Sequence, residues 1–426
     1  MPDPDRRQML KLAAATAAAG ATLGTSAVSA AEPVVDTGAV QAGKIEFPSW
    51  TAPTERPAGP TPAPLPPDRR VGFAVLGLGR LALEEILPAF AESKRAKLVA
   101  LISGTPDKAK LVASQHGIAP EAVFGYGDWE RIKADAAIEV VYVVTPNALH
   151  RESVLAAAAA GKHVLCEKPM ATASADCQAM IDACATADRH LMVAYRCQYE
   201  PNNRALQDMV RTGQYGAPKL YDAVNTQNMA APTQWRLAKR MAGGGALPDI
   251  GLYCLNGIRF LSGEEPVEVF ARTSATPNDP RFREVEEQVS FTLRFPSGLV
   301  ANCAASYGLH ENRRLGLNLP GAAVEFSNAF AYEGQRLQIA HRDGPAEAVV
   351  ERRISAKNQF ALELDHMAEC VTTGRKPRTP GEEGLADQRI MEAIYRSAET
   401  GQPVALPRVE GLDTTRGPAL PPDQAG

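Results

Sequence analysis

The sequence lacks the cysteine and histidine spacings that mark a metal site or a disulfide framework. Its seven cysteines include no C-x-x-C pair, and its seven histidines include no H-E-x-x-H. An odd number of cysteines is also typical of a chain that folds under reducing conditions. We therefore expect neither a bound metal nor a required disulfide.

The chain also lacks a surplus of basic charge and a long hydrophobic run. Its net charge of -4 over 426 residues gives no electrostatic reason to expect a nucleic acid or an anionic membrane as a partner. The alanine-rich apolar run at residues 12–21 is too short for a lasting membrane span. With 45% hydrophobic and 22% charged residues, the composition is that of a globular protein, and this length predicts two domains.

The first thirty residues have the layout of an export signal. Arg6 and Arg7 precede the apolar run, and small residues follow it. This layout resembles a twin-arginine signal, although Asp5 and Met9 stand where Ser or Thr and Phe are usual; a Sec or lipoprotein signal is the alternative. The twin-arginine route carries folded proteins, which suits an enzyme that receives its cofactor in the cytoplasm. We expect residues 1–30 to direct the folded chain to the periplasm.

Residues 31–70 are rich in proline and alanine. Such a stretch disfavours helices and central strands, so we expect an extended arm of polyproline II character. One interpretation is a flexible spacer behind the signal. The other is a rigid arm that lies on a neighbouring subunit and buries Trp50.

From residue 71 onward, short apolar runs alternate with amphipathic segments. Thr105 before Pro106 marks the start of one helix. Strands are expected at residues 73–76, 98–103, 140–145, 163–166 and 191–195. This alternation predicts an α/β domain over residues 71–196, with a doubly wound parallel sheet that binds its ligand at the carboxyl ends of the strands.

The pattern changes near residue 200. Apolar side chains at positions 289, 291, 293 and 295 alternate with polar ones, and a Pro-Ser-Gly turn leads into a second strand at residues 299–306. Further strands are expected at residues 219–224, 267–271, 322–326, 336–339 and 348–351, and helices at residues 360–371 and 385–399. We expect an α+β domain over residues 197–410, with a large, open, mostly antiparallel sheet that serves substrate binding and oligomerisation. Residues 411–426 are expected to form a disordered tail.

The first predicted strand runs into a G-x-G-x-x-A motif made by Gly77, Gly79 and Ala82, with Arg80 and Leu81 between them. Glycines at this spacing let backbone N–H groups approach a pyrophosphate at the start of a helix. By itself the motif fits an ordinary strand-turn-helix as well.

The second strand ends at Ser103, with Lys108 one helical turn further on. NAD-specific domains usually place an acidic residue at this strand end, whereas a hydroxyl and a cation suit the 2′-phosphate of NADP. Asp107 argues against this, unless it only stabilises the first turn of a helix. We expect NADP(H) rather than NAD.

The next two strands end in T-P-N-A-L-H at residues 145–150 and in E-K-P at residues 167–169. Together with the glycine motif, they resemble the superfamily of glucose-fructose oxidoreductase, inositol dehydrogenase and rhizopine-catabolism proteins (Gfo/Idh/MocA). Q-W-R-L at 234–237 and D-I-G-L-Y at 249–253 are similar to its glucose-fructose oxidoreductase branch, as are the signal and the arm. Superfamily members usually have His at the position of Tyr253, and Tyr is this branch's choice.

The resemblance implies three sets of site residues. Lys168, Tyr253 and Asp249 would be catalytic. The cofactor site would comprise Gly77, Gly79, Arg80, Leu81, Ala82, Ser103, Lys108, Thr145, Pro146, Asn147, His150, Glu167, Lys168 and Arg196. The sugar site would comprise Tyr195, Trp235, Arg236, Asp249 and Tyr253. For His150 two interpretations remain: contact with the cofactor ribose, or a hydrogen bond to a backbone carbonyl.

Oxidation of an aldose at its anomeric carbon requires a hydride acceptor and a base for the hydroxyl proton. Tyr253 can exchange that proton if a nearby ammonium, such as that of Lys168, favours the ionised phenol. Which of the two transfers the proton is left open. Asp249, one helical turn before Tyr253, would orient sugar hydroxyls or tune this pair.

The leading hypothesis is a periplasmic sugar oxidoreductase with tightly bound NADP(H). It would oxidise an aldose such as glucose to the lactone and reduce a second sugar, a ketose such as fructose or an aldose, to an alditol by ping-pong hydride transfer. We expect a homo-oligomer, a dimer or tetramer, with the arm of one subunit on its neighbour. The alternatives are a plain NADP-dependent aldose dehydrogenase, an NAD-dependent glycosidase and a sugar sensor without catalysis.

Overall fold

The computed structural model describes residues 39–41, 44–46, 65–230 and 232–408. The predicted signal, Trp50 and the predicted tail lie outside these residues. Within the predicted arm, β1 (Ala39–Gln41) pairs with β2 (Lys44–Glu46) as an antiparallel hairpin. The expectation of polyproline II was therefore wrong for this short segment, which contains no proline and leaves its N–H groups able to pair. The hairpin belongs to a unit separate from the one that begins at Pro64.

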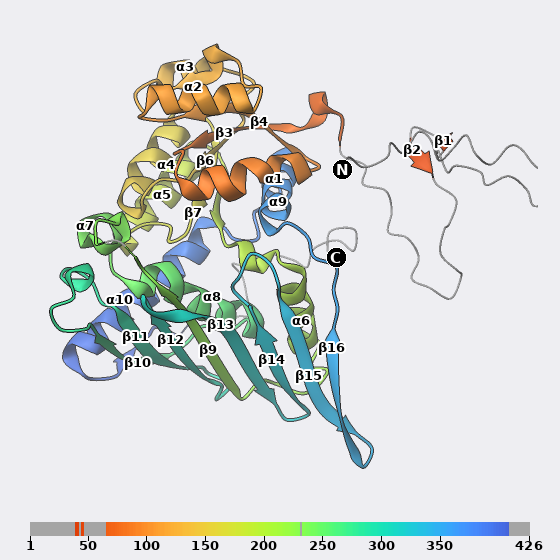
Figure 1. The fold of residues 1–426 in the computed structure, drawn as a ribbon, viewed down its shortest axis with the longest axis vertical. Coiled ribbons are helices and arrows are strands. Elements are labelled where there is room, and N and C mark those ends of the chain that lie inside the picture. The colour runs from red at the N-terminus through yellow and green to blue at the C-terminus, as the bar shows by residue number, and fades with distance from the viewer. Residues whose placement is uncertain (1–38, 42–43, 47–64, 231, 409–426) are drawn as a thin grey trace, which may run out of the picture. The chain divides into compact units, whose positions relative to one another are not determined.

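The larger unit contains the predicted parallel sheet (Figure 1). Its six strands follow the order β5-β4-β3-β6-β7-β8, and all neighbours pair in parallel. The strands are β3 (Val71–Leu76), β4 (Ala96–Ile102), β5 (Val123–Phe124), β6 (Val140–Val143), β7 (His163–Glu167) and β8 (Leu191–Ala194). The prediction of a doubly wound sheet is confirmed; it missed only β5, which has two residues and so carries no periodic signal.

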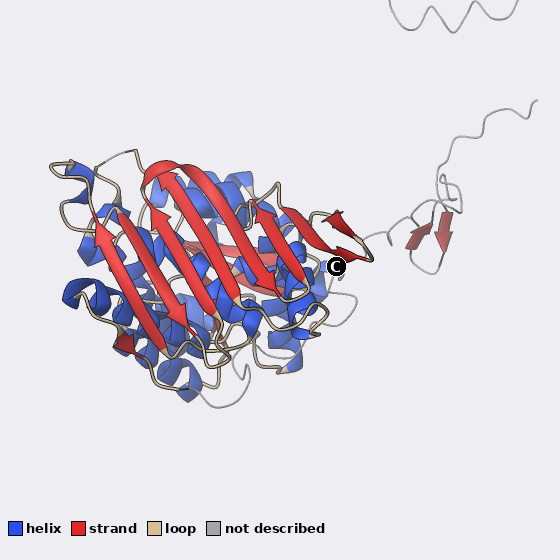
Figure 2. Cartoon of the chain, turned by 90° about the horizontal axis from the view of Figure 1, so that it is seen from below, coloured by secondary structure: helices blue, strands red, loops and turns tan. Residues whose placement is uncertain are grey.

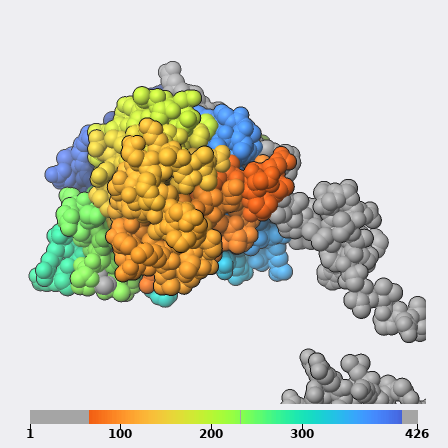
Figure 3. Space-filling model, turned by 90° about the horizontal axis from the view of Figure 1, so that it is seen from above, coloured from red at the N-terminus to blue at the C-terminus, as the bar shows by residue number. Residues whose placement is uncertain are grey.

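Helices cover both faces of this sheet, and the reason is visible along β3. Ala74 and Leu76 pack into one buried cluster, whereas Phe73 and Val75 pack into another. A strand buried on both faces needs a continuous apolar run, which is what the sequence has here. The helical segments are η2 (Pro67–Arg69), η3 (Ala82–Ile86), α1 (Leu87–Glu92), α2 (Pro106–Gln115), η4 (Pro120–Ala122), α3 (Trp129–Ala134), η5 (Asn147–Leu149), α4 (His150–Ala159) and α5 (Ser174–Thr186). Seen from above, this domain, coloured orange to yellow, covers most of the visible surface of the larger unit (Figure 3).

The second sheet has nine strands in the order β16-β15-β14-β13-β9-β12-β11-β10-β17. Only β9 and β12 pair in parallel, so the prediction of a mostly antiparallel sheet is confirmed. The strands are β9 (Leu220–Asn228), β10 (Glu268–Ser274), β11 (Gln288–Arg294), β12 (Val300–Ser306), β13 (Gly308–Leu319), β14 (Ala322–Ser327), β15 (Arg336–Asp343), β16 (Ala346–Arg352) and β17 (Val404–Ala405). One broad face of this sheet is free of helices in Figure 2.

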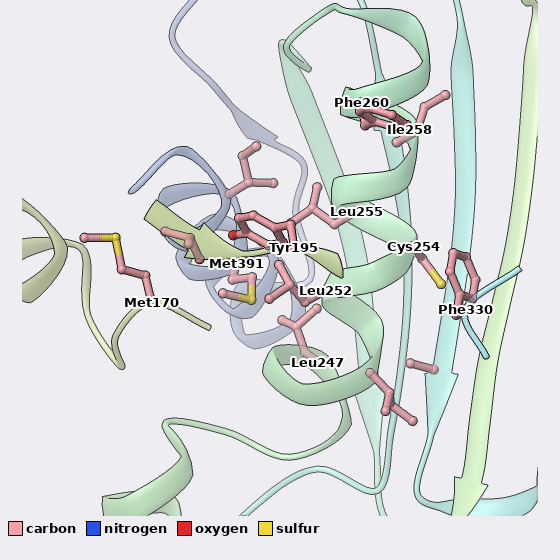
Figure 4. Close-up of a cluster of buried hydrophobic side chains, with 14 of the residues drawn as sticks. Met170, Tyr195, Leu247, Leu252, Cys254, Leu255, Ile258, Phe260, Phe330 and Met391 are labelled. Carbon is pink, nitrogen blue, oxygen red and sulfur yellow. The ribbon is translucent and has the colours of Figure 1, made fainter. Parts of the chain in front are cut away.

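Helices cover the other face of the second sheet. Figure 4 shows Leu252, Leu255 and Ile258 projecting from α8 within a buried apolar cluster. The helical segments in the second half of the chain are η6 (Arg196–Gln198), α6 (Pro201–Arg211), η7 (Trp235–Leu237), α7 (Lys239–Ala242), η8 (Leu247–Gly251), α8 (Leu252–Ser262), η9 (Pro280–Phe282), α9 (Gln359–Thr373) and α10 (Gly381–Thr400). Along the described residues, no helix is both long and apolar enough to cross a membrane.

Helix α9 belongs to the second half of the chain but packs on the first sheet. Its residues Phe360, Leu364 and Met367, predicted to share one face, are buried in the same cluster as Phe73 and Val75 of β3. The two sheets therefore do not form independent cores, and the second half of the chain completes the core around the first sheet.

A buried ionic network joins α8 to α10. Arg259 has no exposed surface, and its guanidinium bonds Glu265 at 2.7 Å and Glu383 at 3.3 Å. It also pairs with Asp387, while Asn256 donates to Asp387 at 2.9 Å. Burying charge is costly unless every group is paired, so each member of this network depends on the others.

We predict that Arg259→Met lowers the free energy of unfolding by about 3 to 5 kcal/mol, because it leaves buried carboxylates without their cation. The matched control is Arg294→Met, which removes the exposed pair with Glu268, where 57% and 39% of the two side chains are accessible. Because water and salt screen this pair, its removal is expected to leave the free energy of unfolding almost unchanged. Urea unfolding at neutral pH measures both, and equal losses would contradict the prediction.

Candidate active site

The site lies where the carboxyl end of β7 meets η8 from the second half of the chain. Lys168 directly follows β7, and its Nζ donates hydrogen bonds to Asp249 Oδ1 at 3.1 Å and to the Asp249 carbonyl oxygen at 2.9 Å. Only 12% and 16% of the two side chains are exposed. The two residues are 81 positions apart in the sequence, so the fold alone brings them together.

Asp249 is held by donors on both carboxylate oxygens. Its Oδ2 accepts from the hydroxyl of Tyr307 at 2.7 Å and pairs with Arg236 Nε at 3.2 Å. Burial raises the pKa of this carboxyl, but Lys168, Arg236 and the Tyr307 hydrogen bond outweigh burial and hold the pKa well below its usual range. Asp249 is therefore an anion whose oxygens are engaged by the protein, which favours a role in tuning its neighbours.

The Lys168 ammonium lies 4.8 Å from the centroid of the Tyr253 ring. Burial lowers the pKa of Lys168, but the neighbouring Tyr253, Asp249 and Glu167 outweigh burial, so the pKa is raised above its usual value. The ammonium therefore keeps its proton at neutral pH. The geometry brings together the three residues that the sequence suggests for catalysis.

The start of η8, which carries Asp249, is built on a run of glycines. The carboxylate of Glu286 accepts from the N–H groups of Gly245 at 2.9 Å and of Leu247 at 3.0 Å. A Cβ on Gly244 would lie 1.9 Å from the hydroxyl oxygen of Tyr395, and a Cβ on Gly245 would lie 2.0 Å from the carbonyl oxygen of Glu286. The glycines permit a close approach that lets a carboxylate cap this helical turn.

The turn after β3 has the geometry of a nucleotide-binding loop. Gly77 has φ +100°, and a Cβ there would lie 2.6 Å from the carbonyl oxygen of Val144, so only glycine fits. A Cβ on Gly79 would meet no atom within 4 Å, which leaves open space at the turn. Leu81 and Ala82 follow at the start of η3, where the first N–H groups of a helix have no intrahelical acceptor. The residues present fit the pyrophosphate of a dinucleotide.

A hydroxyl and two cations lie beside this turn. Ser103 is 5% exposed, and its hydroxyl accepts from the Thr105 N–H at 3.2 Å. Lys108 Nζ donates to the carbonyl oxygen of Leu78 at 2.9 Å and so ties α2 to the turn. Arg80 extends from the turn with 87% of its side chain exposed. These groups suit a 2′-phosphate.

The T-P-N-A-L-H segment packs against the E-K-P segment. His150 has no exposed surface, and its two ring nitrogens lie 3.0 Å and 2.8 Å from the carbonyl oxygens of Pro169 and Thr145. Of the two interpretations of His150, the structure shows the hydrogen bond to the backbone. Asn147, which follows Pro146, donates from its amide to a carbonyl of α7 at 2.9 Å. The Thr145 hydroxyl is buried and has no hydrogen-bond partner among the described residues.

Two predicted cofactor residues are buried beside the site. Glu167 is 7% exposed and accepts from the hydroxyl of Tyr142 at 2.7 Å, and burial raises the pKa of Glu167. Arg196 is 6% exposed and donates to the carbonyl oxygen of Phe330 at 2.7 Å and to Gln359 Oε1 at 2.6 Å. The guanidinium of Arg196 is thus engaged by protein acceptors.

The predicted sugar residues occupy different positions. Tyr195 is 4% exposed and lies in the cluster of Figure 4 near Leu252, and with Lys168 it lines a small cavity. Trp235 and Arg236 are half-buried, and the guanidinium of Arg236 lies 4.5 Å from the centroid of the Trp235 ring. Arg236 is thereby held between an aromatic face and Asp249.

Sequence reasoning missed Tyr307, Glu286 and Gln359, which support the site from outside the recognised motifs. Tyr307 lies between β12 and β13, and Glu286 lies just before β11. The run of glycines at 243–245 was the one available signal, because glycines in sequence often mark a close approach by another group. It does not say which group approaches.

Comparisons with known proteins agree with this architecture. Residues 71–195 match the model of an oxidoreductase family with an NAD-binding Rossmann fold, and residues 203–327 match the GFO/IDH/MocA C-terminal domain. A D-xylose 1-dehydrogenase [NADP(+)] of Haloarcula marismortui is 32% identical over 345 residues, which are 80% of this chain and 94% of the relative.

Solved structures give the same picture. The crystal structure of an aldose-aldose oxidoreductase from Caulobacter crescentus, complexed with glycerol, superposes with a TM-score of 0.76 at 45% identity. The match covers 79% of this chain and 100% of that chain. A levoglucosan dehydrogenase in complex with NADH and levoglucosan has a TM-score of 0.70 at 23% identity, with 80% and 100% covered, which is a likeness of fold alone.

Substitution by alanine at Gly79 and at Gly77 is expected to affect different properties: nucleotide affinity in the first case and stability in the second. Gly79→Ala fills the space open to a ligand, so it should weaken NADPH binding at least about 10-fold with little change in stability. Gly77→Ala clashes with the backbone and strains φ, so it should lower the free energy of unfolding by about 1 to 3 kcal/mol. Fluorescence titration and urea unfolding of nucleotide-stripped protein measure these effects, and destabilisation by Gly79→Ala with unchanged affinity would refute the assignment.

Proposed function

The chain belongs to the Gfo/Idh/MocA family of NAD-binding Rossmann oxidoreductases, and we propose that it oxidises an aldose at C1 to the lactone with NADP(H) as hydride carrier. The observation that carries the proposal is the cluster of Lys168, Asp249 and Tyr253 at the carboxyl edge of the nucleotide-binding sheet. Two relatives support the substrate class through their names, a D-xylose 1-dehydrogenase and an aldose-aldose oxidoreductase.

In this reaction the aldose loses a hydride from C1 and a proton from the C1 hydroxyl, and a carbon–oxygen double bond forms. The nicotinamide, when bound, supplies the hydride acceptor. The residues of the chain must bind the sugar and move the proton. Lys168 follows the carboxyl end of β7, and Tyr253 lies beside it. This position suits both the binding of the sugar and the transfer of its proton.

We assign the proton transfer to Tyr253. Lys168 keeps its proton because its pKa is raised, and the carboxylate of Asp249 is engaged by three side-chain donors and has a lowered pKa. Neither is a good base at neutral pH, whereas an ionised Tyr253 can accept the hydroxyl proton. The Lys168 ammonium stabilises the negative charge that develops on the sugar oxygen. In the reverse direction Tyr253 returns the proton to the carbonyl oxygen of a second sugar.

The preference for NADP over NAD rests on the residues beside the glycine turn. Ser103, Lys108 and Arg80 supply a hydroxyl and two cations, and Lys108 is placed against the turn by its hydrogen bond to Leu78. The H. marismortui relative, whose name specifies NADP(+), supports this choice.

We further propose that the cofactor stays bound while a second sugar is reduced, so that the enzyme works by ping-pong hydride transfer in the periplasm. The support is the signal-like sequence of residues 1–30, because an exported enzyme has no nicotinamide pool to draw on. The second sugar is a ketose or an aldose, and the name of the C. crescentus relative favours an aldose. The proposed arm across a neighbouring subunit would help to retain the cofactor. A dehydrogenase that releases its cofactor is the competing function, favoured by the xylose dehydrogenase relative.

Retention of the cofactor can be measured directly. The full chain, purified by gel filtration without added nucleotide, is expected to release about one NADP(H) per chain on acid precipitation, because a non-dissociating cofactor co-purifies with the protein. An enzymatic assay specific for NADP over NAD quantifies it. A protein that emerges empty and turns over only with added NADP would establish the plain dehydrogenase instead.

The role of Lys168 is tested by comparing two buried lysines. Lys168→Met should slow single-turnover reduction of bound NADP by glucose or xylose about 100- to 10,000-fold, because the sugar oxygen loses its stabilising cation. The control is Lys162→Met, since Lys162 is 6% exposed and donates to the carbonyl oxygen of Asp135 at 2.9 Å, away from the site. The reduced enzyme is then mixed with fructose or with a second aldose to identify the acceptor. Similar rates for both lysine variants would refute the mechanism.

A further inference from the structure

Beside the proposed base lies a buried cation that the mechanism above does not use. We infer that Arg196 is a positioning residue whose guanidinium favours the ionised form of the Tyr253 hydroxyl. The guanidinium carbon lies 4.8 Å from the centroid of the Tyr253 ring, the same distance as the ammonium of Lys168. The inference rests on the proposed function only in taking Tyr253 as the proton-transfer group.

The guanidinium of Arg196 is fixed by neutral groups. Its Nη2 donates to the carbonyl oxygen of Phe330 at 2.7 Å, and its Nη1 donates to the carbonyl oxygen of Ala331 at 3.2 Å and to Gln359 Oε1 at 2.6 Å. None of these acceptors carries a charge that would cancel that of the arginine. Because Arg196 is 6% exposed, water screens its charge weakly.

Aromatic rings and the neutral acceptors together form a cage around the guanidinium of Arg196. The guanidinium carbon lies 4.4 Å from the Tyr332 ring and 5.9 Å from the Phe360 ring, and these two rings are 5.4 Å apart, edge to face. Such faces attract a cation without neutralising it. An arginine keeps its proton throughout the working pH range, so its positive charge beside Tyr253 is permanent.

The carboxyl groups around the site are either paired with cations or buried. The charge of Asp249 is matched by Lys168 and Arg236. Burial raises the pKa of Glu167, and it raises that of Glu363 well above its ordinary value.

Glu85, Cys197 and Tyr332 also interact electrostatically with Arg196. Burial raises the pKa of Glu85 and that of the Cys197 thiol. Burial also raises the pKa of Tyr332 to about 12, so this phenol stays neutral at working pH. Lys168 and Arg196 thus place two positive charges beside the Tyr253 ring, and a nearby cation favours the charged form of an acid.

The test titrates Tyr253 without relying on turnover. The near-ultraviolet absorbance of tyrosinate is followed against pH in the holoprotein, and the Tyr253→Phe curve is subtracted in each background. The Tyr253 midpoint is expected to move up by about 1 pH unit or more in Arg196→Gln, and by less than about half that in Arg196→Lys, which keeps the charge. An unmoved midpoint in Arg196→Gln overturns the inference.

A second pair of variants leaves Arg196 in place. Gln359→Glu puts a carboxylate at the position of Gln359 Oε1, which lies 2.6 Å from the guanidinium, and should raise the Tyr253 midpoint by pairing with it. Gln359→Met is the control without added charge, because both changes remove the hydrogen bonds that the Gln359 amide donates to the carbonyl oxygens of Ala331 and Tyr332, and Met also removes the acceptor for Arg196. Equal shifts in the two variants would show that lost contacts rather than charge move the midpoint, and would overturn the inference even if Arg196→Gln failed to fold.

The pH dependence of kcat separates this inference from the proposed function. If Tyr253 is the base, the acidic limb of the profile with an aldose should move to higher pH in Arg196→Gln by the same amount as the spectroscopic midpoint. A protein that oxidises no aldose but shows the shifted midpoint refutes the proposed function and leaves the role of Arg196 standing. A working enzyme whose midpoint and acidic limb both stay in place refutes the role of Arg196 alone.

Discussion

Two sheets from different parts of the chain meet at one hydrogen-bonded ion pair, between Lys168 after β7 and Asp249 in η8. The pair is largely buried, so its attraction is strong, but so is the cost of removing either charge from water. The structure meets that cost by giving each oxygen of Asp249 at least one donor, from Lys168, Arg236 or Tyr307. This arrangement fixes Lys168, Arg236 and Tyr307 around the carboxylate of Asp249.

The elements behind the ion pair are held rigidly. Glu286 caps the start of η8, and the glycines before it let Tyr395 and the Glu286 backbone approach closely. The helix that continues from η8 is tied to α10 through the buried guanidinium of Arg259. Because packed groups of this kind have few alternative arrangements, Asp249 and Tyr253 are presented to the nucleotide-binding sheet in a defined geometry.

Two cations lie beside Tyr253 and are held in different ways. Lys168 and Arg196 lie at equal distances from its ring, one anchored by a carboxylate and the other by neutral acceptors. The cation that belongs to an ion pair would bind and polarise the sugar oxygen. Arg196, whose hydrogen bonds within the described part of the chain go to neutral acceptors, would act on the phenol. Arg196 lies in a cage formed by η6, α9 and the segment between β14 and β15.

The sequence by itself determined the two-sheet architecture, because continuous apolar runs mark strands buried on both faces, as in β3, and alternating ones mark strands buried on one face, as in β11. It missed β13, where residues 309–314 are mostly exposed and break the alternation, and it missed the two-residue strands β5 and β17. It also identified Lys168, Asp249 and Tyr253, because they lie in motifs. Only the tertiary structure decided which oxygen of Asp249 each donor reaches, that His150 serves the backbone, and that Tyr307, Glu286 and Gln359 support the site. Local periodicity encodes which face of an element is buried, but contacts between residues far apart in the chain depend on how those faces pack, and no local pattern records that.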